Sequence, residues 1–262
     1  MLNDFDMIRH MFPGEIDIYP IADVHLGAVE HCEMEWYAFI KRVEKENAYL
    51  ILAGDLLNNS TRGTQFANPF DEVLRPREAK RRMVEHLLPI RERILCVVSG
   101  NHEQRTLRDS DQDLTYDICS KLDIEHLYRE SMAFMSVGVG QRNSEKKAES
   151  SYVFCVTHGA GGGIYTGAAV NRNERFSQII EGVDCFIAGH VHKGFVTHPA
   201  KIVIDPRNSV VTMRPYVVVS CVSWLNYGGY AARAMLLPAQ VCDPQKLHLV
   251  ANRNVKKIIT TW

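Results

Sequence analysis

Hydrophobic and polar positions follow two different periods in the first part of the chain. Three short apolar runs, each ending in a polar or glycine-containing turn, predict buried β-strands at 16–22, 48–54 and 93–100. Two longer segments between them, Glu30–Glu46 and about Pro76–Arg91, carry apolar side chains at helical spacing. This β-α-β-α-β order predicts parallel strands joined by right-handed crossovers.

The second part of the chain is dominated by strand-like runs. Apolar runs at 152–159 and 183–190 flank a helical stretch near 173–180. Further strand-like segments follow with almost no helix between them, at 201–205, 210–213, 216–224, 232–238 and 246–250. Helices early and strands late predict two packed sheets with helices on the outside. Residues 138–150 are predicted to form an exposed loop within one domain, so we expect 1–262 to be a single domain.

Composition narrows the class of protein. Apolar residues make up 46% of the chain and charged residues 23%, which is typical of a globular protein. Thirty basic residues face 31 acidic ones, for a net charge of −1. This balance excludes a strongly basic, histone-like nucleic-acid binder, although it leaves room for a local basic groove.

Cysteine usage indicates a reducing compartment. The chain has seven cysteines, an odd number with no CxxC pair, and several stand inside apolar runs. The N-terminal residues lack the apolar run of a signal peptide, and no stretch approaches the roughly 18 apolar residues of a membrane span. We therefore expect a cytoplasmic protein that does not enter a membrane.

Residues with metal-binding chemistry stand at the ends of five predicted strands. The turns read DVHLG, GDLLN, GNHE, HG and GHVH in chain order. Ligands of open α/β sheets bind outside the carboxyl ends of the strands, so these turns predict one shared site. The residues concerned are Asp23, His25, Asp55, Asn101, His158, His190 and His192, with His102 beside them.

The chemistry of this set is narrow. Carboxylate, amide and imidazole groups suit divalent ions such as Mn²⁺, Fe²⁺ and Zn²⁺, and the absence of cysteine argues against a structural zinc site. Seven ligands are too many for one ion but fit two ions that share a carboxylate. Any one motif alone has a plain structural explanation as a helix cap, turn or core histidine, but five in order make coincidence improbable. The other histidines are expected to be structural or solvent-facing: His10, His31, His86, His126, His198 and His248.

The series of motifs from Asp23 to His192 resembles the calcineurin-like metallophosphoesterase superfamily. The resemblance implies an α/β fold, a four-layer αββα sandwich whose second sheet comes from the trailing strands. It also implies a metal-dependent phosphoesterase with two divalent ions, most readily Mn²⁺, with Fe²⁺, Zn²⁺ or Ni²⁺ as alternatives.

The resemblance further implies a role for each residue. Three residues would hold the first ion: Asp23, His25 and His192. Three others would hold the second: Asn101, His158 and His190. Asp55 would bridge both ions, and His102 would protonate the leaving-group oxygen. The group that orients His102 stays open among Asp23, Asp55 and Glu103.

The leading hypothesis for the substrate is a phosphodiester in nucleic acid or a nucleotide. The HLG, GDLL and GHVHK sequences resemble the repair-nuclease branch, and the glycine-rich segment 159–176 carries Arg172 and Arg175, which would contact phosphates. The alternative for that segment is a loop followed by a helix with a solvent-facing basic side. Val24 stands where the branch usually has asparagine, and no large capping domain follows, so a smaller stand-alone enzyme fits better.

Two alternatives belong to other classes. A phosphomonoesterase, including a Ser/Thr protein phosphatase, is suggested by GNHE but departs from it at DVHLG and GDLLNNSTRG, where the phosphate-clamping arginine is absent and Arg62 lies a few residues on. A binding module that has lost catalysis is the third hypothesis. The presence of all seven ligands and His102 argues against it.

Overall fold

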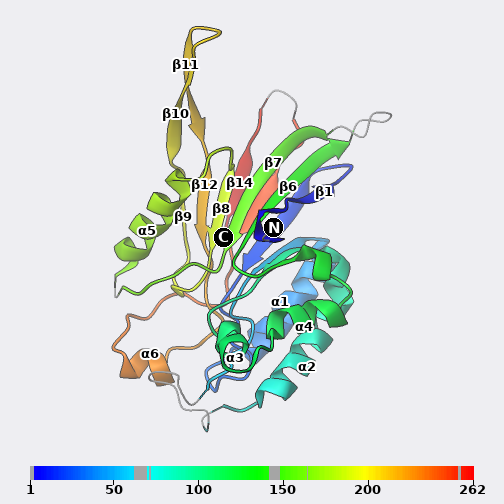
Figure 1. The fold of residues 1–262 in the computed structure, drawn as a ribbon, viewed down its shortest axis with the longest axis vertical. Helices are drawn as coiled ribbons and strands as arrows, with labels where there is room; N and C mark the ends of the chain where they lie inside the picture. The colour runs from blue at the N-terminus through cyan, green and yellow to red at the C-terminus, as the bar shows by residue number, and fades with distance from the viewer. Residues whose placement is uncertain (1–2, 62–69, 71, 142–147, 164, 253–254) are drawn as a thin grey trace.

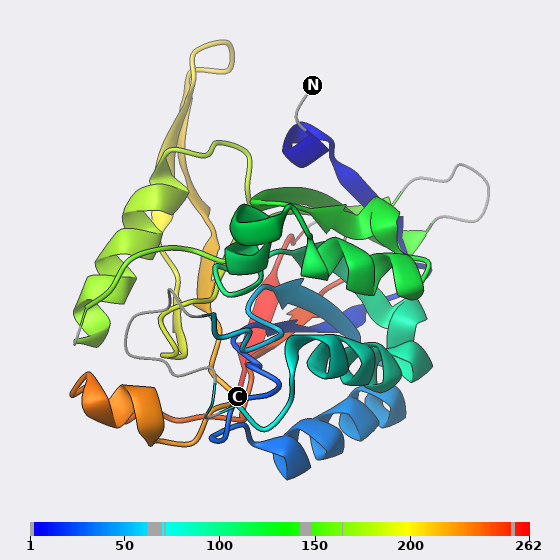
Figure 2. The ribbon, with the colours of Figure 1, turned by 60° about the horizontal axis from the view of Figure 1, so that its bottom comes forward.

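Two six-stranded sheets face each other, and helices cover their outer faces (Figure 1; Figure 2). This computed structural model describes residues 3–61, 70, 72–141, 148–163, 165–252 and 255–262. The predicted αββα class is therefore confirmed. The two sheets enclose the main core, and a second apolar cluster lies between the second sheet and its covering helix.

The first sheet has the order β14-β13-β2-β3-β4-β5. Its strands are β2 (Ile16–Ile21), β3 (Tyr49–Ala53), β4 (Ile94–Val98), β5 (Tyr128–Arg129), β13 (Lys246–Leu249) and β14 (Ile258–Thr261). The three strands expected from the first apolar runs are confirmed, and they pair in parallel. They are apolar on both faces because the sheet is covered on both sides.

Helices α1 (Glu33–Glu46), α2 (Pro76–Leu87), α3 (Glu103–Ser110) and α4 (Leu114–Lys121) lie on the side of the first sheet (Figure 1). Helix α1 starts three residues later than predicted because Cys32 is not helical and its N–H donates to the Trp224 carbonyl. Helix α2 does not reach Arg91 as predicted. A separate 3₁₀ turn, Leu88–Arg93, follows instead, with Pro89 in its first positions, because proline has no N–H to continue the α-helix.

The second sheet has the order β1-β6-β7-β8-β12-β9. Its strands are β1 (Ile8–Met11), β6 (Met132–Gln141), β7 (Ala148–Thr157), β8 (Cys185–Ala188), β9 (Phe195–Thr197) and β12 (Val217–Ser220). Helix α5 (Thr166–Gln178) covers its outer face (Figure 2). The predicted helix near 173–180 thus exists but begins earlier.

Two predictions about the second sheet were wrong. The expected loop at 138–150 is largely strand, since 138–141 end β6 and 148–150 begin β7; residues 142–147 lie outside the described part. Within this segment Ser150 is buried, and its hydroxyl donates to the Asn252 carbonyl at 2.8 Å. The strand expected at 232–238 is also absent, and helix α6 (Gly229–Arg233) ends within it.

The strands expected at 201–205 and 210–213 exist but join neither large sheet. They are β10 (Ala200–Asp205) and β11 (Val210–Pro215), an antiparallel hairpin that projects from the body of the molecule (Figure 1). Ile202 and Met213 pair across it and are 73% and 76% exposed. The apolar residues of these two segments therefore do not mark strands that pack within either large sheet.

All seven cysteines are free, and six of them are buried. None of the helices in the described residues has the length and apolar character that crossing a membrane requires. The cytoplasmic location stays a prediction.

Candidate metal centre

The five predicted turns meet at one edge of the two facing sheets. They follow β2, β3 and β4 in the first sheet and β7 and β8 in the second, so the carboxyl ends of strands from both sheets contribute. Three overlapping groups of possible metal ligands lie there: Asp23 with His25 and His192, His25 with Asp55 and His102, and Asp55 with His158 and His190. The convergence predicted from the sequence is therefore present.

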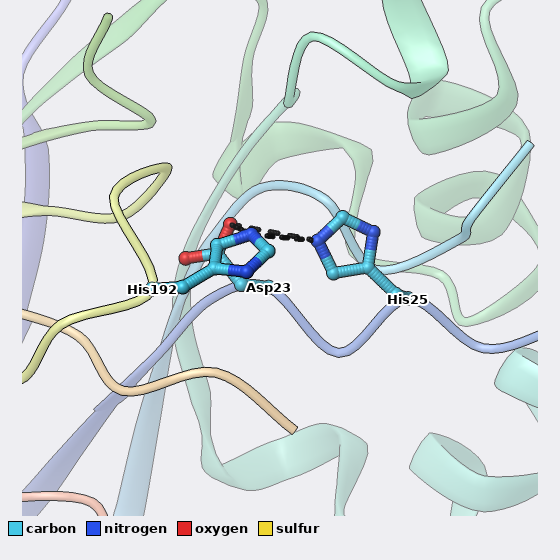
Figure 3. A group of neighbouring side chains, drawn as sticks. All are labelled: Asp23, His25 and His192. Carbon is cyan, nitrogen blue, oxygen red and sulfur yellow. Dashed lines mark hydrogen bonds and ion pairs between the residues drawn. The ribbon is translucent and has the colours of Figure 1, made fainter. Parts of the chain in front are cut away.

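The first group is built from the turns after β2 and β8. Figure 3 shows the side chains of Asp23, His25 and His192 pointing toward one another. Asp23 Oδ1 lies 3.4 Å from His192 Nε2 and 3.8 Å from His25 Nε2, and the two Nε2 atoms are 3.1 Å apart. Asp23 Oδ1 is buried with no hydrogen bond in the described structure. A buried carboxylate oxygen facing two imidazoles fits a divalent cation of the Mn²⁺, Fe²⁺ or Zn²⁺ kind.

A second set of ligands consists of Asn101, His158 and His190, and we call it the second group. Asn101 Oδ1 lies 2.9 Å from His158 Nε2 and 2.8 Å from His190 Nδ1. The two imidazole nitrogens are 3.3 Å apart. His158 is fixed from behind, because its Nδ1 lies 2.9 Å from the carbonyl oxygen of Ala53. That contact leaves Nε2 directed into the site.

Asp55 connects the two groups. Its Oδ2 lies 3.1 Å from His158 Nε2 and 3.9 Å from His25 Nε2. Its Oδ1 accepts a hydrogen bond from the His102 backbone N–H at 2.9 Å. Burial alone would raise the pKa of this carboxyl, but the neighbouring imidazoles of His102 and His158 hold it well below its usual range. Asp55 is thus an ionised, fully buried carboxylate between two sets of ligands.

Unusual backbone conformations bring these side chains together. Five of the predicted ligands have positive φ: Asp23 (54°), His25 (50°), Asp55 (50°), His190 (73°) and His192 (55°). Residues other than glycine rarely adopt this left-handed region, and such strain is common at functional sites. Gly100 permits the closest approach, because a Cβ there would lie 2.1 Å from the Asp55 nitrogen. The turns after β3 and β4 can touch only with glycine at this position.

The imidazole of His102 is oriented by a backbone carbonyl. Its Nδ1 lies 2.5 Å from the Asn58 oxygen, while Nε2 lies 3.6 Å from Asp55 Oδ2. None of the three carboxylates considered from the sequence holds Nδ1. Burial lowers the pKa of His102 to about 4, with Asp55 opposing and Arg105 adding to that shift. An anionic phosphate beside the ring would raise this pKa again.

Two buried residues support the site in ways that the sequence reasoning did not assign: Glu103, considered there only as a candidate for orienting His102, and Asn59, which was not considered. Glu103 is 1% exposed and accepts backbone N–H bonds from Asp55 at 3.2 Å, Leu57 at 2.8 Å and Gly100 at 3.0 Å. Burial, together with the Asp55 charge, raises the pKa of Glu103 to about 7. Asn59 is 2% exposed and donates through Nδ2 to the His102 carbonyl at 2.7 Å. The fourth position of GNHE was the available signal for Glu103.

The arginines considered from the sequence differ in their surroundings. Arg172 Nη1 donates to the Ala160 carbonyl at 2.6 Å and Nη2 to the Gly162 carbonyl at 3.4 Å, so its guanidinium holds the glycine-rich segment. Arg175 is exposed on α5. Arg62 lies outside the described residues.

A family model described as calcineurin-like phosphoesterase matches residues 16–194. The chain belongs to this family. The match includes all five turns and every predicted ligand, and the family uses divalent metals. The protein is therefore a metal-dependent phosphoester hydrolase. A comparison with curated proteins found no match.

Solved structures resemble the chain only distantly. YfcE, a phosphoesterase from E. coli, is 15% identical, with a TM-score of 0.41 and coverage of 94% of this chain and 98% of that one. GAP50, the anchor in the inner membrane complex of Plasmodium, is 11% identical, with a TM-score of 0.45 and coverage of 94% and 84%. A predicted phosphoesterase from Streptococcus pneumoniae is 11% identical, with a TM-score of 0.36 and coverage of 95% and 99%. All three scores are below 0.5, and the family assignment depends on the family model instead.

Proposed function

We propose that the protein is a two-metal phosphodiesterase or nuclease that acts on nucleic acid or a nucleotide. The observation that carries the proposal is the position of Asp55, whose Oδ2 lies within 4 Å of imidazoles from both ligand groups. One shared carboxylate between two sets of nitrogen and oxygen ligands suits a pair of ions better than a single one.

The ligands divide between two divalent ions. The first ion would be held by Asp23, His25 and His192, and the second by Asn101, His158 and His190. Asp55 would contact both. When bound, such ions neutralise charge on phosphoryl oxygens and lower the pKa of water toward neutrality. Mn²⁺ is the proposed metal, because oxygen ligands accompany the imidazoles; Fe²⁺, Zn²⁺ and Ni²⁺ are the alternatives.

His102 is the proposed general acid. Its Nδ1 is held by the Asn58 carbonyl, so Nε2 faces the site and can donate a proton to the leaving alkoxide. Proton donation of this kind is worth roughly 10²–10⁴ in rate. Arg172 and Arg175 stay proposed phosphate contacts; for Arg172 this requires release from the Ala160 carbonyl.

A basic groove supports a polyanionic substrate. A cavity of about 1160 Å³ runs along α2 and is lined by Arg75, Arg77, Lys80, Arg81 and Lys121, with only Glu78 and Glu85 as carboxylates. The segment before α2 also reaches the site, since Glu72 Oε1 accepts from Asn58 Nδ2 at 3.2 Å. Five cationic side chains against two carboxylates along this groove favour a nucleic-acid strand over a small neutral ester. We also propose that residues 1–262 form a single domain, because turns from both sheets contribute to the same site.

The test compares substrates at equal Mn²⁺. We expect single-stranded oligonucleotides to be hydrolysed faster than phosphopeptides and nucleoside monophosphates, with Asp55→Asn and His102→Asn as inactive controls. Added salt should weaken oligonucleotide binding. A preference for a phosphopeptide or monophosphate would make the protein a phosphomonoesterase. Binding without any hydrolysis by metal-loaded protein would favour the non-catalytic module.

A further inference from the structure

A small cavity of about 250 Å³ opens beside the first ligand group. Lys193 and Gly194, the two residues after His192, line it, together with Val222, Gln240 and Trp262. Val222 also connects the cavity with the ligands, because it precedes Ser223, whose hydroxyl donates to the Asp23 carbonyl at 3.4 Å. The lining of the cavity therefore includes residues from the segments that position Asp23 and His192.

Strand order explains why Trp262 reaches this cavity. Strand β14 is antiparallel to β13, and β13 is antiparallel to β2, so β14 runs in the same direction as β2. Trp262 follows β14 as Asp23 follows β2, and both therefore lie at the same edge of the first sheet. A Cβ at Gly194 would stand 3.0 Å from Trp262 Cη2, so glycine leaves the indole its place.

The chemistry of the lining fits a flat, polar-edged ring. Trp262 is 56% exposed, whereas the other two tryptophans, Trp36 and Trp224, are fully buried. Exposed aromatic rings bind nucleobases by stacking, and Lys193 adds a cation on the side of the metal ligands. Gln240 Nε2 donates to Asp243 at 3.0 Å, which leaves its carbonyl oxygen to accept from a base edge.

We propose that this cavity binds the nucleobase next to the scissile phosphate, with the base stacked on Trp262 and Lys193 near the phosphate. The proposal rests on the proposed nucleotide chemistry and assigns where specificity for a nucleoside arises. The volume is below the roughly 300–1,000 Å³ of sites for drug-sized ligands, so one base with its sugar is the ligand that fits. Trp262 acts by binding and takes no part in the bond cleavage.

Two chromogenic diesters with the same leaving group separate base binding from catalysis. We would compare the p-nitrophenyl ester of thymidine 5′-monophosphate with ethyl p-nitrophenyl phosphate in Mn²⁺-loaded protein. Trp262→Ala should raise KM for the thymidine ester about tenfold and leave kcat/KM for the ethyl ester unchanged, while Trp262→Phe should restore most of the affinity. An equal loss on both esters, or no loss on either, would overturn the proposal.

A binding measurement keeps this inference separate from the proposed function. AMP should quench the fluorescence of the wild-type protein, whereas ribose 5-phosphate, which lacks the base, should not. The Trp262→Phe variant retains only buried Trp36 and Trp224 and should show no quenching by AMP. If AMP quenches wild type and variant equally, the base does not bind here, whatever the enzyme hydrolyses. If quenching is as expected but neither ester is cleaved, the base site stands and the diesterase function fails.

Discussion

Replacing Asn59 by alanine should damage both stability and turnover. The side chain is buried and donates to the His102 carbonyl at 2.7 Å and to Thr106 Oγ1 at 2.8 Å, while Thr106 donates back to Asn59 Oδ1 at 3.1 Å. It thereby ties the turn after β3 to the start of α3, where His102 stands. The residue also has a φ of 44°, which asparagine tolerates better than alanine.

The expected loss of stability combines these terms. Each lost hydrogen bond contributes about 1 kcal/mol, but His102 O and Thr106 Oγ1 are partly accessible to water, so roughly 2 kcal/mol is expected from the three. Alanine in the left-handed region adds about 1 kcal/mol. The free energy of unfolding should therefore fall by about 3 kcal/mol, which corresponds to roughly 6–12 °C in Tm for a chain of this size.

Matched variants separate the backbone from the hydrogen bonds. Asn59→Gly should recover about 1 kcal/mol relative to Asn59→Ala, because glycine removes the conformational penalty. Thr106→Val keeps the bond to the His102 carbonyl, so it should lower stability by about 1 kcal/mol and leave kcat near wild type. Urea unfolding of metal-free protein and steady-state kinetics provide the two readouts.

The effect on kcat should depend on the hydrogen bond between Asn59 and the His102 carbonyl. We expect kcat of Asn59→Ala to fall about tenfold, a fraction of the full general-acid contribution, because Asn58 still holds the imidazole. A change in unfolding free energy below about 0.5 kcal/mol would refute the stability argument. Equal effects of Asn59→Ala and Thr106→Val on kcat would refute the positional one.

The remaining predictions concern the metals, the acid and pH. Reconstitution with Mn²⁺ should give close to two ions per chain by elemental analysis and raise the free energy of unfolding by about 2.7 kcal/mol per site at one hundred times Kd. Asp55→Asn should lose most of the bound metal and most of this stabilisation. A wild-type stoichiometry of one ion would rule out the two-metal scheme. His102→Asn should keep both ions while turnover falls, with a smaller effect for good leaving groups; loss of an ion would show that His102 is a ligand. Burial lowers the pKa of His86, whose Nδ1 accepts from Trp36 Nε1 at 3.1 Å, so stability should fall as pH drops below the unfolded value of 6.5. His86→Asn keeps an acceptor without titrating, and a loss of stability between pH 7.5 and 5.5 as large as that of wild type would contradict this assignment.

The sequence was most informative where function constrains side-chain type. Asp23, Asp55 and His158 could be grouped because each follows an apolar run, and parallel strands bring their carboxyl ends together. The Asn58 carbonyl that holds His102 could not be found in this way, since every residue carries such an oxygen. The three backbone bonds to Glu103 likewise depend on how two turns approach each other in space.

The fold errors have a related origin. Ile202 and Met213 stand in short apolar segments like those of a packed strand, but such a pattern does not reveal whether another sheet covers the apolar side chains. The error at 138–150 was the reverse, because a polar composition concealed long strands that pair with each other. Local pattern predicts the element and its faces, while its partner depends on contacts far along the chain.

The left-handed backbone of five predicted ligands lowers the stability of the fold. At about 1 kcal/mol for each non-glycine residue, these turns cost roughly 5 kcal/mol, which is comparable with the whole net stability of many domains. Bound ions offset that loss of stability only while they are present. In a lineage that stopped using metal, glycine at these positions would raise the stability of the fold. Substitutions to glycine would therefore be favoured there over other substitutions. Glycine in place of His25 or Asp55 in a descendant would then indicate that metal binding has been lost. The free energy of unfolding of that descendant would be higher than that of the metal-free form of its active ancestor.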